Sequence, residues 1–232
     1  MLALTDYENL LKTAIEEKID VVFLSAGLPL KIPTECLKNT HTALVIKVSS
    51  AKAVNLIFKY WSEKYNRIPD GVVIEGPLAG GHLGFKQNDL KTNKYDLSTL
   101  IKETREVVDV YEEKFQKQIP LIAAGGIYTG EDIYNIMQMG ATGVKLGTRF
   151  VTTHECDASI EFKYSYLDCN KNDLEIIKSP VGLPGRVIKN DFVKQIVIGN
   201  KKVFKCPWQC LKSCKIKEAP FCIAQALLNS AK

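Results

Sequence analysis

The chain has 232 residues, of which 46% are hydrophobic and 25% are charged, with a net charge of +5. These are ordinary values for a folded domain, and they argue against a disordered or fibrous chain. No run of 18 apolar residues and no basic patch interleaved with aromatic residues occurs, so we expect neither a membrane nor a nucleic-acid partner. The chain also begins without a basic segment followed by an apolar one, which predicts a cytoplasmic protein.

The first 150 residues alternate between helical and strand-like segments. The first helix is expected to begin at Thr5 as N-cap and to bury Leu10, Leu11, Ala14 and Ile15 on one face. In chain order the patterns predict a helix over residues 6–18, strands over 20–24 and 43–48, a helix over 51–64, a strand over 71–75, a helix over 97–115, a strand over 120–123, a helix over 130–139 and a strand over 143–146.

Apolar strands separated by helices of 10 to 19 residues are typical of a parallel sheet with βαβ crossovers. Each strand ends in small or glycine-rich residues, which suits a fold that binds ligands at the carboxyl ends of its strands. The residues therefore predict an α/β fold, either a barrel or an open doubly wound sheet. Five strands are clear, and Met1–Leu4 could be the tail of a sixth.

After Phe150 the alternation stops, and residues 151–232 are expected to form a helical and loop appendage packed on residues 1–150. Residues 180–185 are rich in proline and glycine and predict a turn. Residues 191–198 are apolar and could be a helix or a strand, whereas residues 220–231 predict a terminal amphipathic helix.

Four of the seven cysteines, Cys206, Cys210, Cys214 and Cys222, lie close together in this appendage. Two interpretations stay open, a zinc or iron–sulfur site and a set of free structural thiols. The spacing lacks the familiar pair of cysteines two residues apart, so we favour free thiols and expect no metal.

The strongest sign of chemistry is the segment 73–84, which places His82 among three glycines directly after a strand. Glycines allow positive φ angles and a close approach of the backbone to a ligand. A histidine on such a loop titrates near neutrality and can donate or accept a proton. We therefore expect His82 to be functional, and we expect His41 and His154, which lie in no motif, to be surface residues.

Two further motifs follow consecutive strands, Ile122-Ala-Ala-Gly-Gly-Ile127 and Val144-Lys-Leu-Gly-Thr-Arg-Phe150. A strand that ends in glycines before a helix exposes backbone N–H groups and can seat a phosphate. One such turn is weak support, but two at consecutive strand ends are similar to the phosphate site formed by the last two strands of a β/α barrel.

Together and in this order, three motifs resemble the nitronate monooxygenase family, which is close to the FMN-dependent enoyl-ACP reductases. They are Ala79-Gly-Gly-His-Leu-Gly84, Ala123-Ala-Gly-Gly-Ile127 and Lys145-Leu-Gly-Thr-Arg-Phe150. The resemblance implies a (β/α)8 barrel with FMN at the carboxyl ends of its strands, and an activity that oxidises alkyl nitronates with molecular oxygen.

The resemblance also implies roles for single residues. His82 matches the catalytic histidine and would act as acid/base. Gly125, Gly126, Gly147 and Thr148 would hold the FMN phosphate, with Lys145 and Leu146 lining the same loop. The remaining expected cofactor contacts are near the flavin ring: Lys47, Glu75, Gly80 and Gly81.

Two departures from the family pattern keep alternatives open. Glu75 stands where many nitronate monooxygenases have glutamine, which is more like the enoyl-ACP reductases and leaves an NAD(P)H-dependent reductase acting on an enoyl thioester as a second function. The chain also enters at what looks like the third strand, so that about two βα units are lacking. It could therefore be a truncated, non-catalytic piece that only binds FMN, and it could form a homodimer.

Overall fold

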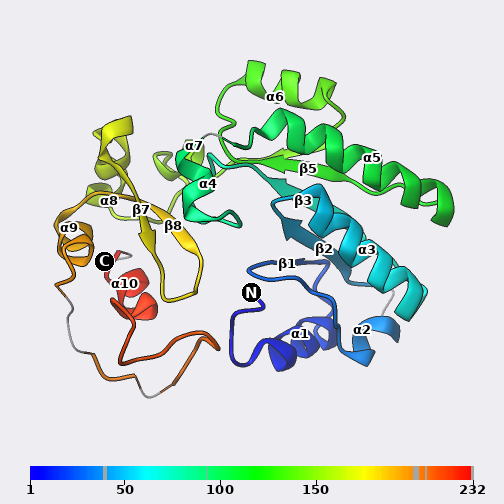
Figure 1. The fold of residues 1–232 in the computed structure, drawn as a ribbon, viewed down its shortest axis with the longest axis horizontal. Helices are drawn as coiled ribbons and strands as arrows, with labels where there is room; N and C mark the ends of the chain where they lie inside the picture. The colour runs from blue at the N-terminus through cyan, green and yellow to red at the C-terminus, as the bar shows by residue number, and fades with distance from the viewer. Residues whose placement is uncertain (39–40, 93, 201–203, 207, 231–232) are drawn as a thin grey trace.

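The computed structural model describes residues 1–38, 41–92, 94–200, 204–206 and 208–230. Its centre is a five-stranded parallel sheet in the order β1-β2-β3-β5-β6 (Figure 1). The strands span Val21–Leu24, Ala43–Val48, Gly71–Glu75, Leu121–Ala124 and Gly143–Lys145. The expected parallel α/β sheet of five strands is confirmed, and every strand begins or ends within one residue of its expected bounds.

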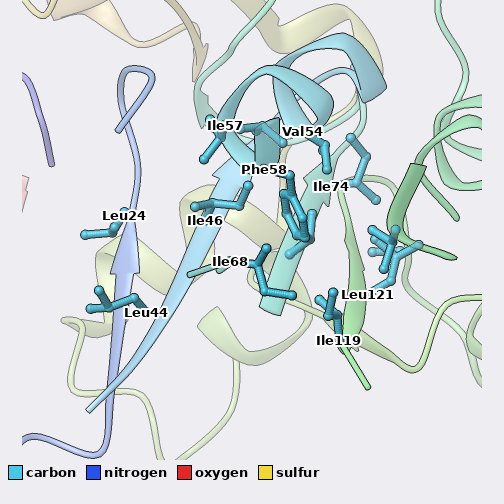
Figure 2. Packing of buried hydrophobic residues seen from close by; sticks show 14 of the residues in the cluster. Leu24, Leu44, Ile46, Val54, Ile57, Phe58, Ile68, Ile74, Ile119 and Leu121 are labelled. Atoms are coloured by element: carbon cyan, nitrogen blue, oxygen red, sulfur yellow. The ribbon is translucent and has the colours of Figure 1, made fainter. Parts of the chain in front are cut away.

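Helices of the first part cover one face of this sheet, as Figure 1 shows for α3 and α5. The helices in residues 1–150 span α1 Tyr7–Glu16, α2 Thr34–Lys38, α3 Ala51–Tyr65, α4 Gln87–Lys91, α5 Leu97–Phe115, α6 Gly130–Gln138 and α7 Thr148–Val151, and α3 and α5 are the long ones on the covered face. Figure 2 shows Phe58 of α3 between Ile46 of β2 and Ile74 of β3, and all three are fully buried. This helix-covered face holds the main hydrophobic core.

Polar side chains fix where the long helices begin. Ser50 accepts a hydrogen bond from the N–H of Ala53 at the start of α3, and Asp96 does the same for Thr99 at the start of α5. Thr129 and Asp132 form a reciprocal capping box at the start of α6. Such caps satisfy backbone donors that have no partner inside the helix.

The structure of the residues before β1 differs from the one that the sequence predicts. Asp6, not Thr5, is the N-cap of α1, and its side chain makes no capping bond. The Thr5 hydroxyl instead donates to the carbonyl of Gln209. Leu4 forms an isolated antiparallel bridge with Leu211, so residues 1–4 add no sixth strand to the sheet. Five strands leave three, not two, to complete a barrel of eight.

The C-terminal part contains more strand than the sequence predicts. Helix α8 (Ile160–Leu167) and a short 3-10 turn (Lys171–Asp173) lead to strands β7 (Leu174–Lys178) and β8 (Pro184–Ile188). These strands form a hairpin, and β8 also pairs antiparallel with the short β4 (Gly81–His82). The expectation of helices and loops alone is therefore wrong, because pairing with the loop after β3 stabilises a hairpin.

Two helices complete this part. Residues 191–198, ambiguous in the sequence, form α9 (Asp191–Val197), and α10 spans Ile223–Ser230 inside the expected terminal helix. Ala231 lies outside the described residues, as do Lys201 and Lys202. None of the helices in the described ranges is long and apolar enough to cross a membrane.

Candidate active site

A cavity of about 510 Å³ opens at the carboxyl ends of β1, β2 and β3. Its walls are residues 25–28 after β1, residues 47–50 at the end of β2, and residues of the long segment after β3. Four of the residues expected to form the site lie together in this wall, namely Lys47, Glu75, Gly80 and His82. The cavity lies where a parallel α/β sheet places its ligands.

His82 is held by a residue that the sequence did not indicate. Its Nε2 lies 2.7 Å from the hydroxyl oxygen of Ser179, which is 4% exposed and follows β7 directly. The same oxygen accepts a hydrogen bond from the N–H of Val181 at 3.3 Å. The turn expected over residues 180–185 thus orients the imidazole. In the sequence, the only hint of Ser179 is that it directly precedes the turn predicted over residues 180–185.

Lys47 and Glu75 form an ion pair on neighbouring strands, with 2.6 Å between Nζ and a carboxylate oxygen. Both side chains point to the face of the sheet that the main helices leave uncovered, and the Glu75 side chain is only 7% exposed. Burial lowers the pKa of His82 below its ordinary value of 6.5, and the charge of Lys47 lowers it further. Both effects favour the neutral imidazole, which is the form that can accept a proton.

Arg186 of β8 fixes the segment that leads to His82. Its Nη1 donates to the carbonyl of Pro77 at 2.7 Å and to that of Ala79 at 2.6 Å. Gly84, at the other end of the segment, packs closely on Ser49, and a Cβ at this position would lie 2.4 Å from the Ser49 hydroxyl. The conformation of this segment therefore depends on Arg186 from the C-terminal part and on the absence of a side chain at Gly84.

The two glycine turns lie side by side at the ends of β5 and β6, because Ala124 is in register with Lys145. Gly125 has a φ of +95°, and a Cβ there would lie 2.9 Å from the N of Ala79, so this turn also packs against the His82 segment. Gly126, Gly147 and Thr148 are exposed beside it. Adjacent exposed turns of this kind can seat a phosphate.

The expected site residues do not all line one cavity. Lys145 and Leu146 line a second cavity of about 400 Å³ on the uncovered face of the sheet. The four residues expected to bind the phosphate line neither cavity, and Gly81 is exposed beside the first. The residues expected near the flavin ring and the residues expected at its phosphate thus lie on separate surfaces. Both surfaces are at the carboxyl ends of the strands.

The remaining candidates lie away from these surfaces. His41 and His154 are exposed, as expected. The four clustered cysteines are free thiols. Across the described part of the chain, no three histidine, cysteine or acidic residues are arranged to hold a metal ion.

Comparison with known proteins agrees with this architecture. The model of the family described as nitronate monooxygenase matches residues 1–232. A probable nitronate monooxygenase from Staphylococcus saprophyticus is 27% identical over 190 residues, which are 82% of this chain and 50% of that protein. The chain belongs to the nitronate monooxygenase family, a family of oxidoreductases.

Solved structures show the same fold. FabK from Thermotoga maritima superposes with a TM-score of 0.67 and 28% identity over 84% of this chain and 54% of that one. A nitroalkane oxidase from Streptomyces ansochromogenes, 24% identical, superposes with a TM-score of 0.63 over 82% of this chain and 50% of that one. The five-stranded sheet is thus part of a TIM-barrel fold, and the chain spans about half the length of the relatives that it matches.

Proposed function

We propose that the chain carries the acid/base and much of the FMN site of an enzyme that oxidises alkyl nitronates with molecular oxygen. The observation that carries this proposal is the cavity whose wall brings His82 together with the Lys47–Glu75 ion pair, of which the carboxylate is buried. It lies beside the two glycine turns at the ends of β5 and β6. Membership of the nitronate monooxygenase family supports the same activity.

The residues present fit a flavin mononucleotide. A Cβ built on Gly80, Gly81 or Gly147 meets no atom within 4 Å, so the backbone there borders open space that a ligand can occupy. Gly125, Gly126, Gly147 and Thr148 would hold the phosphate, and Lys145 and Leu146 would line that end. Lys47, Glu75, Gly80 and Gly81 would lie near the ring system. When bound, the flavin supplies the redox chemistry.

The chain's own residues would bind the substrate and control its proton. The Lys47 ammonium favours an anion such as a nitronate over a neutral nitroalkane. The ring nitrogen of His82 that does not contact Ser179 would accept or return the proton that interconverts these two forms, and Ser179, 2.7 Å from Nε2, would hold the ring in position. Glu75 would hold the Lys47 side chain in place through their ion pair of 2.6 Å.

A His82→Gln variant tests this role. We expect the variant to keep its FMN, seen as flavin absorbance near about 450 nm, while turnover of an alkyl nitronate falls by about 10²–10⁴-fold. His154→Gln, at an exposed position outside the site, is the matched control and should retain full turnover. Unchanged turnover in the His82 variant would remove this residue from the mechanism.

A reductase is the second candidate, because Glu75 stands where many nitronate monooxygenases have glutamine and is more like the enoyl-ACP reductases. Anaerobic mixing distinguishes the two functions. Loss of flavin absorbance on addition of a nitronate, with a slow response to NAD(P)H alone, supports the oxidase. Fast bleaching by NAD(P)H alone would instead assign the site to a nicotinamide-dependent reductase.

A further inference from the structure

Four of the seven cysteines lie in one stretch of the C-terminal part, between α9 and α10. We call residues 206–222, described except for residue 207, the cysteine-rich segment, and it contains Cys206, Cys210, Cys214 and Cys222. In Figure 1 this segment passes beside the start of the chain on its way from α9 to α10. All four thiols are free and half-buried, so each keeps some surface that a small oxidant can reach. The proposed function uses none of them.

Backbone hydrogen bonds fix the middle of the cysteine-rich segment against the first residues of the chain. The N–H of Thr5 donates to the carbonyl of Cys210 at 3.1 Å, and the N–H of Lys212 donates to the carbonyl of Ala3 at 2.9 Å. The residue between these two bonds, Leu211, is buried. The segment is therefore folded onto the rest of the chain, and its thiols have defined neighbours.

Cys214 is the centre of the cluster of thiols. Its N–H donates to the carbonyl of Leu211 at 3.3 Å, and a turn of this kind brings the residues on its two sides together. Burial raises the pKa of Cys214, and three neighbouring thiols raise it further. These neighbours are Cys206, Cys210 and Cys222. A neighbouring group shifts a pKa only from a short distance, so Cys214 has a choice of thiols close to its own.

The residue before Cys214 connects this cluster to the candidate active site. The Ser213 hydroxyl donates to the carbonyl of Val181 at 3.0 Å. The N–H of Val181 in turn donates to the hydroxyl oxygen of Ser179 at 3.3 Å, and the same oxygen lies 2.7 Å from Nε2 of His82. A movement of Cys214 can therefore reach the imidazole through one turn of the chain.

We propose that the cysteine-rich segment is an oxidation site, in which hydrogen peroxide joins Cys214 to another thiol of the segment and loosens the turn that orients His82. The first step oxidises one thiol to a sulfenic acid and releases one water. The second thiol then displaces the hydroxyl of the sulfenic acid, which forms the S–S bond and releases a second water. Two thiols and one peroxide thus become one disulfide and two waters.

Formation of this disulfide requires the segment to move. A disulfide needs Cα atoms about 4.4–6.8 Å apart and a Cβ–S–S–Cβ dihedral near about 90°, whereas the thiols are free here. Cys214 must therefore turn toward its partner, and Ser213, which is covalently joined to it, moves as well. We expect the bond between Ser213 and Val181 to break, so that the turn opens more often.

Peroxide treatment of the purified protein, followed by peptide mapping, tests the chemistry. We expect a cross-link between Cys214 and another cysteine of the segment, and dithiothreitol should reverse it. Cys36 is fully buried, and burial raises its pKa to about 11, so it should stay reduced. Four free thiols in the treated segment would overturn the proposal, as would a disulfide that leaves Cys214 out. Tightly bound zinc that protects the thiols would also overturn it and would assign the cluster to a metal.

Hydrogen exchange over residues 179–183 tests the coupling to His82. Peroxide should raise this exchange at least about fivefold in the wild type, and dithiothreitol should restore it. Cys214→Ser should show neither the cross-link nor the response. Cys169→Ser, at a half-buried thiol outside the segment, is the matched control and should respond like the wild type. Exchange that stays unchanged or slows in the wild type once the disulfide has formed would overturn the coupling, whether or not the variants fold.

Discussion

His82 has an imidazole whose proton affinity depends on groups from several separate elements. Burial under the segment after β3 and the β7–β8 turn lowers its pKa, and the ammonium of Lys47 on β2 lowers it further. Because the unfolded chain binds this proton more readily, His82 opposes folding as the pH falls below 6.5, the ordinary value for histidine. The same shift keeps the imidazole available as a base at neutral pH.

Replacement of Lys47 by methionine should raise the pKa of His82, because a nearby positive charge is removed. The acid limb of the pH profile of kcat/KM should then move to higher pH, and an NMR titration of the imidazole should show the same shift. Lys47→Met combined with Glu75→Gln controls for the carboxylate left unpaired in the single variant. An imidazole that titrates unchanged in both variants would contradict the assignment.

We expect Ser179 to be a positioning residue rather than a catalytic one, because it touches His82 and does not line the cavity. Loss of its hydroxyl in Ser179→Ala should lower kcat about five- to tenfold, equivalent to one hydrogen bond of about 1 kcal/mol. KM and flavin content should change little. Ser179→Thr, which keeps the hydroxyl, should restore much of the rate. A lower thermal midpoint with normal kcat would show that the serine only stabilises the fold.

At the scale of elements, Asp70 directly precedes β3 and bonds to three other segments of the chain. It accepts a hydrogen bond from the N–H of Leu44 on β2 at 2.8 Å, and it pairs with Arg67 and with Lys117, which follows α5. Burial raises the pKa of Asp70, but the bonds from Leu44, Lys117 and Arg67 outweigh this effect and lower it overall. The carboxylate therefore stabilises the sheet when it is ionised.

Asp70→Asn should lower the free energy of unfolding by about 2 kcal/mol at neutral pH, since hydrogen bonds to a charged group are lost. A lowered pKa gives stability that is present above 3.8, the ordinary value, and that is lost as the pH falls further. Urea unfolding should therefore show a difference between variant and wild type that shrinks below this pH. Asp109→Asn, which breaks the more exposed bond to Arg105, should cost under about 0.5 kcal/mol.

At the scale of the whole molecule, the C-terminal part contributes to the site formed by the first 150 residues. Strand β8 pairs with β4, and Ser213 of the cysteine-rich segment donates to the carbonyl of Val181 in the turn that follows Ser179. The expected boundary after Phe150 stays a prediction, but the two parts share the geometry of His82.

Arg186→Met should test that coupling. Without its two bonds to the carbonyls of Pro77 and Ala79, the segment that carries His82 should open more often. Hydrogen exchange over residues 79–83 should rise at least about tenfold, whereas exchange in β2 and β3 should not change. Arg186→Lys keeps the charge and should give a smaller effect. Equal exchange in wild type and Arg186→Met would show that the C-terminal part does not hold this segment.

Much of the first part was predictable because its signals are local. Val72, Ile74 and Ile46 alternate with residues of the other face, and Ser50 and Asp96 mark helix starts. The hairpin β7–β8 was missed because its strands are short and half-exposed, so that pairing with β4 decides their conformation. Thr5 was mistaken for an N-cap because its hydroxyl finds the carbonyl of Gln209, 204 residues away.

The sequence by itself determined the parallel sheet and the glycine turns, because hydrophobic periodicity and glycine content act within a few residues, and it singled out His82 as a candidate. Only the tertiary structure decided which groups surround His82. Ser179 is 97 residues away in the chain, and Arg186 lies more than 100 residues from the carbonyls that it binds. Such contacts depend on how the C-terminal hairpin packs against the sheet, and no local pattern encodes that arrangement.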